Sequence, residues 1–196
     1  RVFYRGWIGT EIVKAVKAQG GILTQDDLAG YRVAWRKPVQ CSYREHYRVF
    51  SMPPPSSGGI AVIQVLRMLE RCNLRALGHN SSSHLHRLTE AMKHAFADRA
   101  RHLGDPDFVK VPVARLTSPA YLRKLSRRIG RRVLNKLEAY GSGAPRAQPG
   151  RDSGTSHISV VDEAGNAAAL TTTINTGFGA LVVTGRTGVI LNNQMD

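Results

Sequence analysis

The chain has only two cysteines among 196 residues, Cys41 and Cys72. Two cysteines are too few for a disulfide framework, and their spacing does not match a metal site. The sequence therefore leaves open whether the two thiols are paired or free. The chain also lacks any stretch that approaches 18 uninterrupted apolar residues, so we expect no transmembrane helix within it.

Acidic residues are scarce. The chain has 14 Asp and Glu residues and 28 Lys and Arg residues, which gives a net charge of +14. A positive charge of this size is typical of proteins that bind nucleic acids, but no aromatic platform or groove-reading motif lies among the basic residues. We therefore predict no nucleic-acid partner and interpret the densest basic cluster as a solvated helix face. That cluster comprises Arg123, Lys124, Arg127, Arg128, Arg131, Arg132 and Lys136.

Most of the chain before residue 137 has the periodicity of helices. We expect helices from residue 8 to the glycine pair at 20 and 21, from Ile60 to Leu69, from Ser83 to His102, and from Pro119 to Ile129. Thr24 and Asp27 predict a capping box that opens a further short helix. Residues 31–52 predict two strands joined by a turn, and the PPPSSGG segment after them predicts a loop.

The helix expected over residues 83–102 carries two stripes of side chains. Its apolar stripe comprises Leu85, Leu88, Met92, Ala95 and Phe96. The other stripe repeats every four residues and comprises His86, Glu90, His94, Asp98 and His102. Such a ladder could ligate a metal ion, because successive turns bring these side chains close together. A solvated polar face is the commoner arrangement, and we expect that one.

Residues 137–154 are rich in Gly, Pro, Ser and Ala, which is typical of a flexible linker. Segments with strand character follow, and the turn DEAGNA predicts that two of them form a hairpin. If this turn is centred on Gly165 and Asn166, Thr155 lies opposite Ile174, Asn175 or Thr176. The pairing would also make Thr173 a near neighbour of Thr155.

Thr155 is a candidate nucleophile. A threonine hydroxyl attacks only when a base removes its proton, and a threonine at the start of a chain supplies its own α-amine as that base. The α-amine pKa of about 7.7–8.0 suits this task near neutral pH. Thr155 would acquire such an amine if the chain were cut between Gly154 and Thr155. The alternative is that these threonines and serines are ordinary strand residues.

Long motifs of the chain resemble the γ-glutamyltranspeptidase family. GTSHISVVDEAGNAAALTTTINTGFGALVVTGRTGVILNNQMD is similar to the start of the family's small subunit, whereas FSMPPPSSGGIAVIQVLRMLE and ADRARHLGDPDFV are similar to the end of its large subunit. The resemblance implies an α+β fold of the N-terminal-nucleophile hydrolase type, an αββα sandwich that is partial here. It also implies that residues 1–154 and 155–196 belong to two subunits of one precursor, which stay together as a heterodimer after self-cleavage.

The resemblance implies a role for each candidate site residue. Thr155 matches the nucleophile and Thr173 the residue that orients it, while Asn175 and Gln194 match residues that hold the α-carbon groups of a γ-glutamyl donor such as glutathione. Gly154 and Thr155 match the self-cleavage pair. Water, an amino acid or a peptide would be the acceptor, and no metal or organic cofactor is implied. For His157 we expect a structural or processing role, since an α-amine already suffices as base.

Some features of the family pattern are changed or lie outside the sequence. Ser156 stands where the commonest pattern has a second threonine. The acidic residue and the arginine that bind the donor, and the Gly-Gly pair of the oxyanion hole, are not in it. We therefore expect a piece of a longer periplasmic or extracellular protein that is inactive alone. A same-fold amidase, such as a cephalosporin acylase or a poly-γ-glutamate processing enzyme, and an inactive remnant or basic binding module remain alternatives. Asn175 and Gln194 favour γ-glutamyl chemistry.

Overall fold

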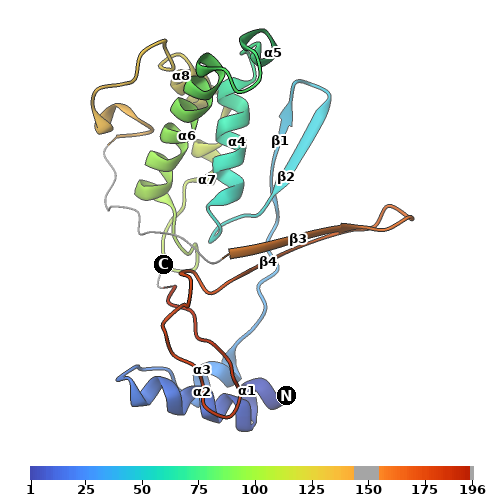
Figure 1. Ribbon diagram of the computed structural model, residues 1–196, viewed down its shortest axis with the longest axis vertical. Coiled ribbons are helices and arrows are strands. Elements are labelled where there is room, and N and C mark those ends of the chain that lie inside the picture. Colours follow the sequence, from blue (N-terminus) through green and yellow to red (C-terminus); the bar gives the residue numbers. More distant parts are fainter. Residues whose placement is uncertain (144–154, 195–196) are drawn as a thin grey trace. The chain divides into compact units, whose positions relative to one another are not determined.

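The computed structural model describes residues 1–143 and 155–194, and the chain divides into two compact units (Figure 1). One unit comprises Arg1–Ala34 with Gly150–Asp196, and the other comprises Trp35–Pro149. Each unit combines helices with a two-stranded antiparallel sheet, which confirms the predicted α+β class. The predicted subunit boundary after residue 154 stays a prediction, because it concerns a bond cleavage. Within the described ranges, no helix has the length and apolarity needed to cross a membrane.

The first unit begins with three helices, α1 (Val2–Arg5), α2 (Trp7–Ala18) and α3 (Gln25–Gly30). As predicted, α2 ends before the glycine pair, and Gly20 adopts the left-handed conformation at φ +76°. The capping box of α3 is also confirmed. The Asp27 amide donates to the Thr24 hydroxyl at 3.2 Å, and the Thr24 amide donates to the Asp27 carboxylate at 2.8 Å.

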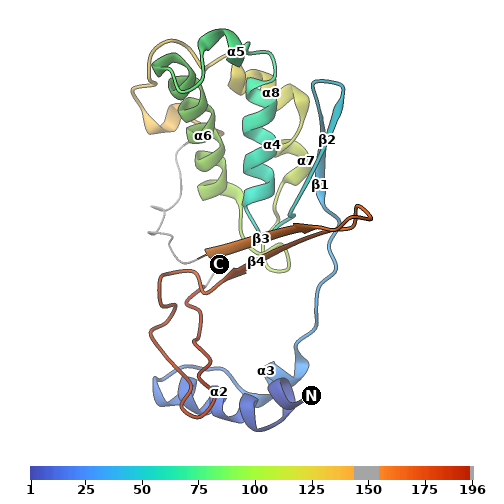
Figure 2. The same ribbon diagram turned by 45° about the vertical axis from the view of Figure 1, so that its right-hand side comes forward.

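The second unit is built around α4 (Gly58–Leu69). Figures 1 and 2 show α4 between α6 (Ser82–His102) and the hairpin of β1 (Val39–Tyr43) and β2 (Tyr47–Ser51). The remaining elements are α5 (Leu74–Leu77), α7 (Val113–Leu116), α8 (Pro119–Ser126) and a short 3-10 helix, η1 (Leu137–Ala139). The strands begin at residue 39 and α8 ends at residue 126, so both are shorter than the sequence predicted.

The start of α4 corrects the prediction for the PPPSSGG segment. The helix begins at Gly58, inside the segment expected to be a loop. Gly59 is buried, and a Cβ atom at this position would collide with the carbonyl oxygen of Met52. Glycine therefore permits the first turn of α4 to lie directly against the chain that leaves β2.

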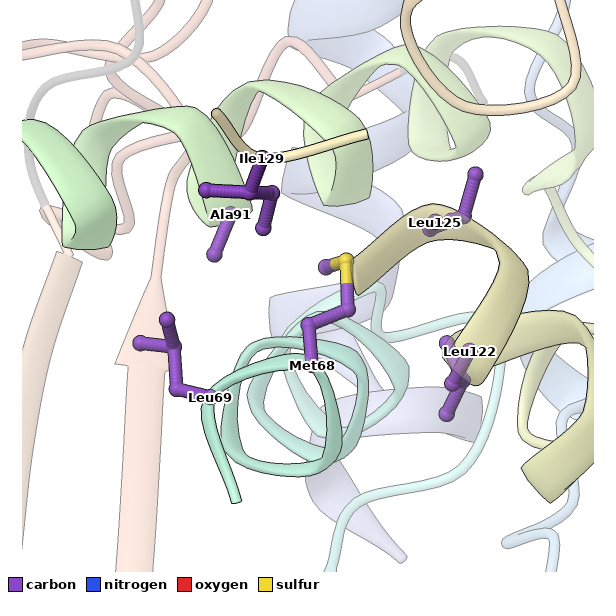
Figure 3. Close-up of a cluster of buried hydrophobic side chains, with 6 residues drawn as sticks. All are labelled: Met68, Leu69, Ala91, Leu122, Leu125 and Ile129. Atoms are coloured by element: carbon purple, nitrogen blue, oxygen red, sulfur yellow. The ribbon is translucent and has the colours of Figure 1, made fainter. Parts of the chain in front are cut away.

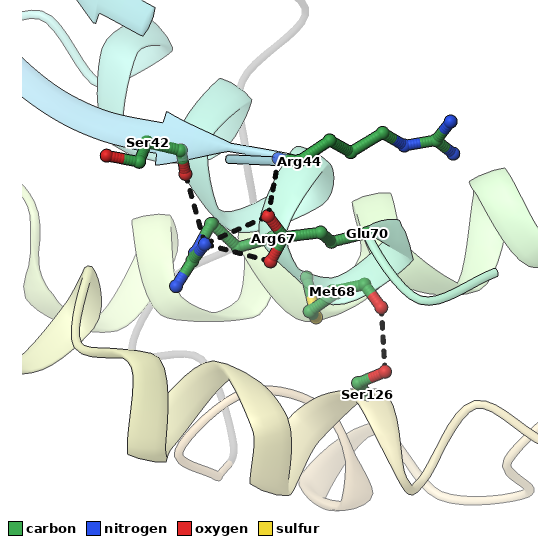
Figure 4. A network of polar contacts seen from close by, with 6 residues as sticks. All are labelled: Ser42, Arg44, Arg67, Met68, Glu70 and Ser126. Carbon is green, nitrogen blue, oxygen red and sulfur yellow. Dashed lines mark hydrogen bonds and ion pairs between the residues drawn. The ribbon is translucent and has the colours of Figure 1, made fainter. Parts of the chain in front are cut away.

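Apolar side chains from three helices form the main core of this unit (Figure 3). The cluster comprises Met68 and Leu69 of α4, Ala91 of α6, Leu122 and Leu125 of α8, and Ile129. Each of these side chains is at most 5% exposed. Ser126 reinforces the contact, since its hydroxyl donates to the carbonyl oxygen of Met68 at 2.7 Å (Figure 4).

A polar network fixes the β1–β2 turn to the end of α4 (Figure 4). The backbone amide of Arg44 donates to the Glu70 carboxylate at 2.8 Å, and Arg67 forms an ion pair with the same carboxylate at 2.8 Å. Arg67 also donates to the carbonyl oxygen of Ser42 at 3.0 Å. The turn needs this support, because Arg44 and Glu45 both adopt positive φ angles, which non-glycine residues rarely do.

Both cysteines of the chain, Cys41 and Cys72, are free and partly buried. Burial raises the pKa of the Cys41 thiol, while the nearby Arg67 acts in the opposite direction. The question that the sequence left open is therefore answered in favour of free thiols.

The three central residues of the polar ladder of α6 are buried, so the prediction of a solvated face is wrong for them. Glu90, His94 and Asp98 are at most 1% exposed, whereas the apolar residues Leu85, Met92 and Phe96 are 43–46% exposed. Ala91 and Ala95 lie on the same buried face of α6. Their small side chains permit close packing on this face, which the periodicity of large apolar residues did not reveal.

Hydrogen bonds compensate the buried carboxylate of Asp98. This group accepts from the Tyr121 hydroxyl at 2.7 Å and from the Gln64 side-chain amide at 2.9 Å. Burial and the bond to Asp98 raise the pKa of Tyr121, so that its hydroxyl remains a donor. No group of three His, Cys, Asp or Glu side chains suited to a metal ion occurs in the described part of the chain.

Residues 137–143 also differ from the prediction of a flexible linker. They include the 3-10 helix η1 and Tyr140, which is only 4% exposed. The rest of the predicted linker, residues 144–154, lies outside the described residues. An ordered and packed segment therefore precedes it.

We predict that the α8 contact is a main source of stability for the second unit. Leu122→Ala should lower the free energy of unfolding by about 2–5 kcal/mol, because it removes a fully buried side chain and leaves a cavity. Lys124→Ala, on the exposed side of the same helix, should change it by less than about 0.5 kcal/mol. Urea unfolding followed by circular dichroism measures both values, and equal effects would contradict the packing described.

We predict that the free energy of unfolding decreases as the pH falls from about 6.5 to about 4. Burial lowers the pKa of His94 to about 4, so the unfolded chain binds a proton in this range that the folded chain does not. Stability should fall by up to about 3 kcal/mol as the pH drops through this window. His94→Asn, which cannot titrate, should flatten this part of the unfolding free energy plotted against pH. An unchanged slope in the variant would refute a neutral buried imidazole.

Candidate active site

The candidate nucleophile lies on the hairpin of β3 (Thr155–Val161) and β4 (Ala167–Thr173), visible in Figure 1 as two long strands. The predicted register is wrong by one residue at least, because Thr155 pairs directly with Thr173. The reason is the turn, which spans residues 162–166 and is centred on Ala164. The Asp162 carboxylate accepts from the Asn166 backbone amide at 2.7 Å and from its side-chain amide at 2.8 Å.

This register gives the hairpin two chemically different faces, because side chains alternate along each strand. Thr155, His157 and Ser159 of β3 share one face with Thr171 and Thr173 of β4. The opposite face carries the apolar residues Ile158, Val160 and Leu170. The hydroxyl-rich face is therefore a single continuous surface.

Thr155 and Thr173 form a direct hydrogen bond. The Thr155 hydroxyl donates to the Thr173 Oγ1 atom at 3.0 Å. The same oxygen accepts from the backbone amide of Asn175 at 2.9 Å. The segment that follows β4 thus holds the Thr173 hydroxyl, which in turn fixes the position of the Thr155 oxygen.

Asn175 follows β4 in a left-handed conformation at φ +74°, which Asn tolerates better than most residues. Asn193 lies against the segment around it. The Asn193 amide donates to the Ile174 carbonyl at 3.4 Å, and its side-chain oxygen accepts from the Thr176 amide at 3.3 Å. Asn193 precedes Gln194 and Ile174 precedes Asn175, so the sequence neighbours of the two predicted donor-binding residues are hydrogen-bonded to each other.

His157 has two hydroxyl partners on this face. Its Nδ1 atom lies 2.7 Å from the Thr171 hydroxyl, and its Nε2 atom lies 3.0 Å from the Ser159 hydroxyl. Both ring nitrogens are therefore occupied by groups other than Thr155. The structural or processing role expected for His157 stays a prediction.

Sequence reasoning did not identify Thr171, Ser159 and Asn193. The first two continue the hydroxyl face, and the alternation of strand residues could have indicated them. Asn193 acts across a loop that starts at residue 174, and no local pattern predicts such a contact. Gly154, the expected partner of Thr155 in self-cleavage, lies outside the described residues.

The arrangement can present one oriented hydroxyl to an electrophile. Thr155 is the first described residue after the predicted cleavage position, its oxygen is fixed by Thr173, and it lies on an exposed face in the described chain. A hydroxyl in this setting still needs a base. An α-amine at Thr155 would be a base on the same residue.

The chain is similar to known proteins over its whole length. A family model described as gamma-glutamyltranspeptidase matches residues 1–196. The glutathione hydrolase proenzyme of Escherichia coli is 44% identical over 195 residues, which cover 99% of this chain and 33% of that protein. The chain thus spans about a third of the length of the curated relatives that it matches.

Solved structures also match the chain. The Helicobacter pylori gamma-glutamyltranspeptidase matches with a TM-score of 0.65 and 45% identity, over 70% of this chain and 39% of that one. A cephalosporin acylase from Bacillus halodurans matches with a TM-score of 0.77 and 27% identity, over 98% of this chain and 33% of that one. The fold is that of the N-terminal-nucleophile hydrolases. On the match of the whole chain to the family model, this chain belongs to the gamma-glutamyltranspeptidase family.

Proposed function

We propose that this chain is part of a γ-glutamyl transferase and hydrolase that matures by cutting itself between Gly154 and Thr155. The Thr155 hydroxyl adds to the Gly154 carbonyl carbon, and the peptide nitrogen leaves as an amine, so that an ester joins the two residues. Water then hydrolyses the ester. The products are a carboxylate on Gly154 and a free α-amine on Thr155.

In turnover, the α-amine takes the proton of the Thr155 hydroxyl as the oxygen attacks the γ-carbonyl of the donor. The amine product leaves with a proton, and a γ-glutamyl ester remains on Thr155. Water resolves the ester to glutamate, whereas an amino acid or peptide resolves it to a new γ-glutamyl amide. Backbone amides would hold the oxyanion in both steps. This scheme uses no metal ion or organic cofactor.

One observation carries the proposal: the 3.0 Å bond from the Thr155 hydroxyl to Thr173, whose oxygen is itself held by the Asn175 amide. It supports Thr155 as nucleophile and Thr173 as the residue that orients it, because a fixed oxygen raises the fraction of reactive geometries. We assign Asn175 and Gln194 to the α-carbon groups of a donor such as glutathione. The residues that precede them, Ile174 and Asn193, are hydrogen-bonded to each other, which supports a shared task.

A relative also supports the proposed processing into two subunits. The Escherichia coli relative is described as a proenzyme, which supports a precursor that yields two subunits of one heterodimer. We place the mature enzyme in the periplasm or outside the cell.

A same-fold amidase with another acyl donor is the second candidate. The similarity to the cephalosporin acylase of Bacillus halodurans, at a TM-score of 0.77, favours it. The two candidates share the nucleophile and differ in whether the site recognises an α-amine on the donor.

We predict that Thr155→Ala abolishes both maturation and turnover in the full-length protein, while Thr155→Ser retains part of each. Thr173→Ala should slow both at least about tenfold, because the nucleophile loses its orienting partner. Gel analysis over time with sequencing of new N-termini measures maturation, and release of a chromogenic anilide measures turnover.

Thr172→Ala is the matched control, since Thr172 lies on the opposite face of β4 and pairs with Ser156. Its rates should stay within about twofold of the wild type. Normal maturation of Thr155→Ala would remove the basis of the proposal.

We also predict donor selectivity. A γ-glutamyl anilide should react with a kcat/KM at least about 100-fold above that of a glutaryl anilide, which lacks the α-amine. Asn175→Ala should reduce this ratio by weakening the γ-glutamyl reaction alone. Equal rates for the two anilides would favour the amidase of different acyl specificity.

A further inference from the structure

The buried ladder of α6 binds three consecutive residues that precede the predicted cleavage position. The Tyr140 hydroxyl donates to the Glu90 carboxylate at 2.8 Å. The Gly141 amide donates to Nδ1 of His94, and the Ser142 amide donates to the Asp98 carboxylate, each at 2.8 Å. Successive residues of the segment thus meet successive turns of the helix.

Further contacts hold the same segment. The Ser142 hydroxyl lies 2.6 Å from Nε2 of His102, which continues the four-residue spacing of the ladder. Arg128 donates to the carbonyl oxygens of Ala139 and Gly141. Residues 139–142 therefore have polar partners on α6 and after α8 at once.

The backbone of Gly141 fits this site only as glycine. Its φ angle is +51°, and a Cβ atom would lie 2.7 Å from the Asp98 carboxylate and 3.0 Å from the His94 carbonyl oxygen. The helix backbone cannot yield as a flexible side chain would. The close approach is what lets the Gly141 and Ser142 amides reach buried acceptors.

Burying polar groups costs free energy of folding, and apolar residues on this face of α6 would avoid that cost. Here residues 140–142 supply one hydrogen bond to each of Glu90, His94 and Asp98. Lys93 also bonds Glu90, and Gln64 and Tyr121 also bond Asp98. Holding that segment is therefore one task that the ladder performs. The segment lies twelve residues before Gly154, so the anchored end limits how far the chain can extend to the cleavage position, to about 40 Å.

We propose that α6 is a positioning element for self-cleavage: by holding residues 140–142 it fixes the upstream end of the chain that leads to the Gly154–Thr155 bond. The inference rests on the self-cleavage proposed above. Fixing one end of a chain removes conformations in which its far end is misplaced, so a larger fraction of molecules reaches the reactive geometry. Once the bond is cut, turnover at Thr155 no longer depends on this anchor.

The test is Gly141→Ala in the full-length precursor, with Gly130→Ala as the matched control. Gly130 has no positive φ angle, and a Cβ atom there would make only an ordinary contact at 3.9 Å. We expect Gly141→Ala to mature at least about tenfold more slowly, and Gly130→Ala to mature within about twofold of the wild type. The fraction of Gly141→Ala that does mature should hydrolyse a γ-glutamyl anilide with a kcat/KM within about twofold of normal.

Tyr140→Phe keeps the inference testable if Gly141→Ala does not fold. It removes the hydroxyl that bonds Glu90 and should slow maturation about twofold to fivefold, while the matured fraction keeps a kcat/KM within about twofold of the wild type. Maturation at the normal rate in both variants would overturn the inference, and so would an equal loss of maturation and of kcat/KM. Thr155→Ala separates the two proposals, because its cleavage would defeat the proposed function itself, whereas a normal Gly141→Ala defeats only the anchor.

Discussion

The register of the β3–β4 hairpin is the constraint on which the candidate site depends. Side chains alternate along a strand, so a shift of one residue would move Thr155 to the face that carries Ile158 and Val160. The turn between the strands sets this register, through the bonds from Asn166 to the Asp162 carboxylate. These bonds also lower the pKa of Asp162, which keeps the acceptor charged. A surface turn therefore decides whether two threonines eighteen positions apart in the sequence can meet.

The second unit uses polar groups where most small helical units use apolar ones. Its core combines the apolar cluster around Met68 with the buried side chains of Glu90, His94 and Asp98. Such groups make a structure specific, because a displaced partner leaves a buried acceptor unsatisfied. Residues 140–142 supply one partner to each of these three groups, so the order of this short segment and the order of α6 support each other.

Local signals in the sequence predicted much of the fold. The capping box at Thr24, the end of α2 before Gly20 and the existence of both hairpins follow from short-range patterns, and the structure confirms them. The pairing of Thr155 with Thr173 was predicted only as a neighbourhood, since the turn could be centred on more than one residue. The burial of Glu90, His94 and Asp98 was missed, because their partners are far away in the sequence or are backbone amides, which no side-chain pattern records. Asn193 was missed for the same reason.

The apolar face of the β3–β4 hairpin has a consequence for the candidate nucleophile. Ile158, Val160 and Leu170 are 56–60% exposed in the described chain, and a two-stranded hairpin alone is marginally stable in water. The chain spans about a third of the length of its curated relatives. Packing of further protein against the apolar face would restrict the motion of the opposite face, which carries Thr155. Covering of the apolar face and ordering of the Thr155 side chain would then be one event.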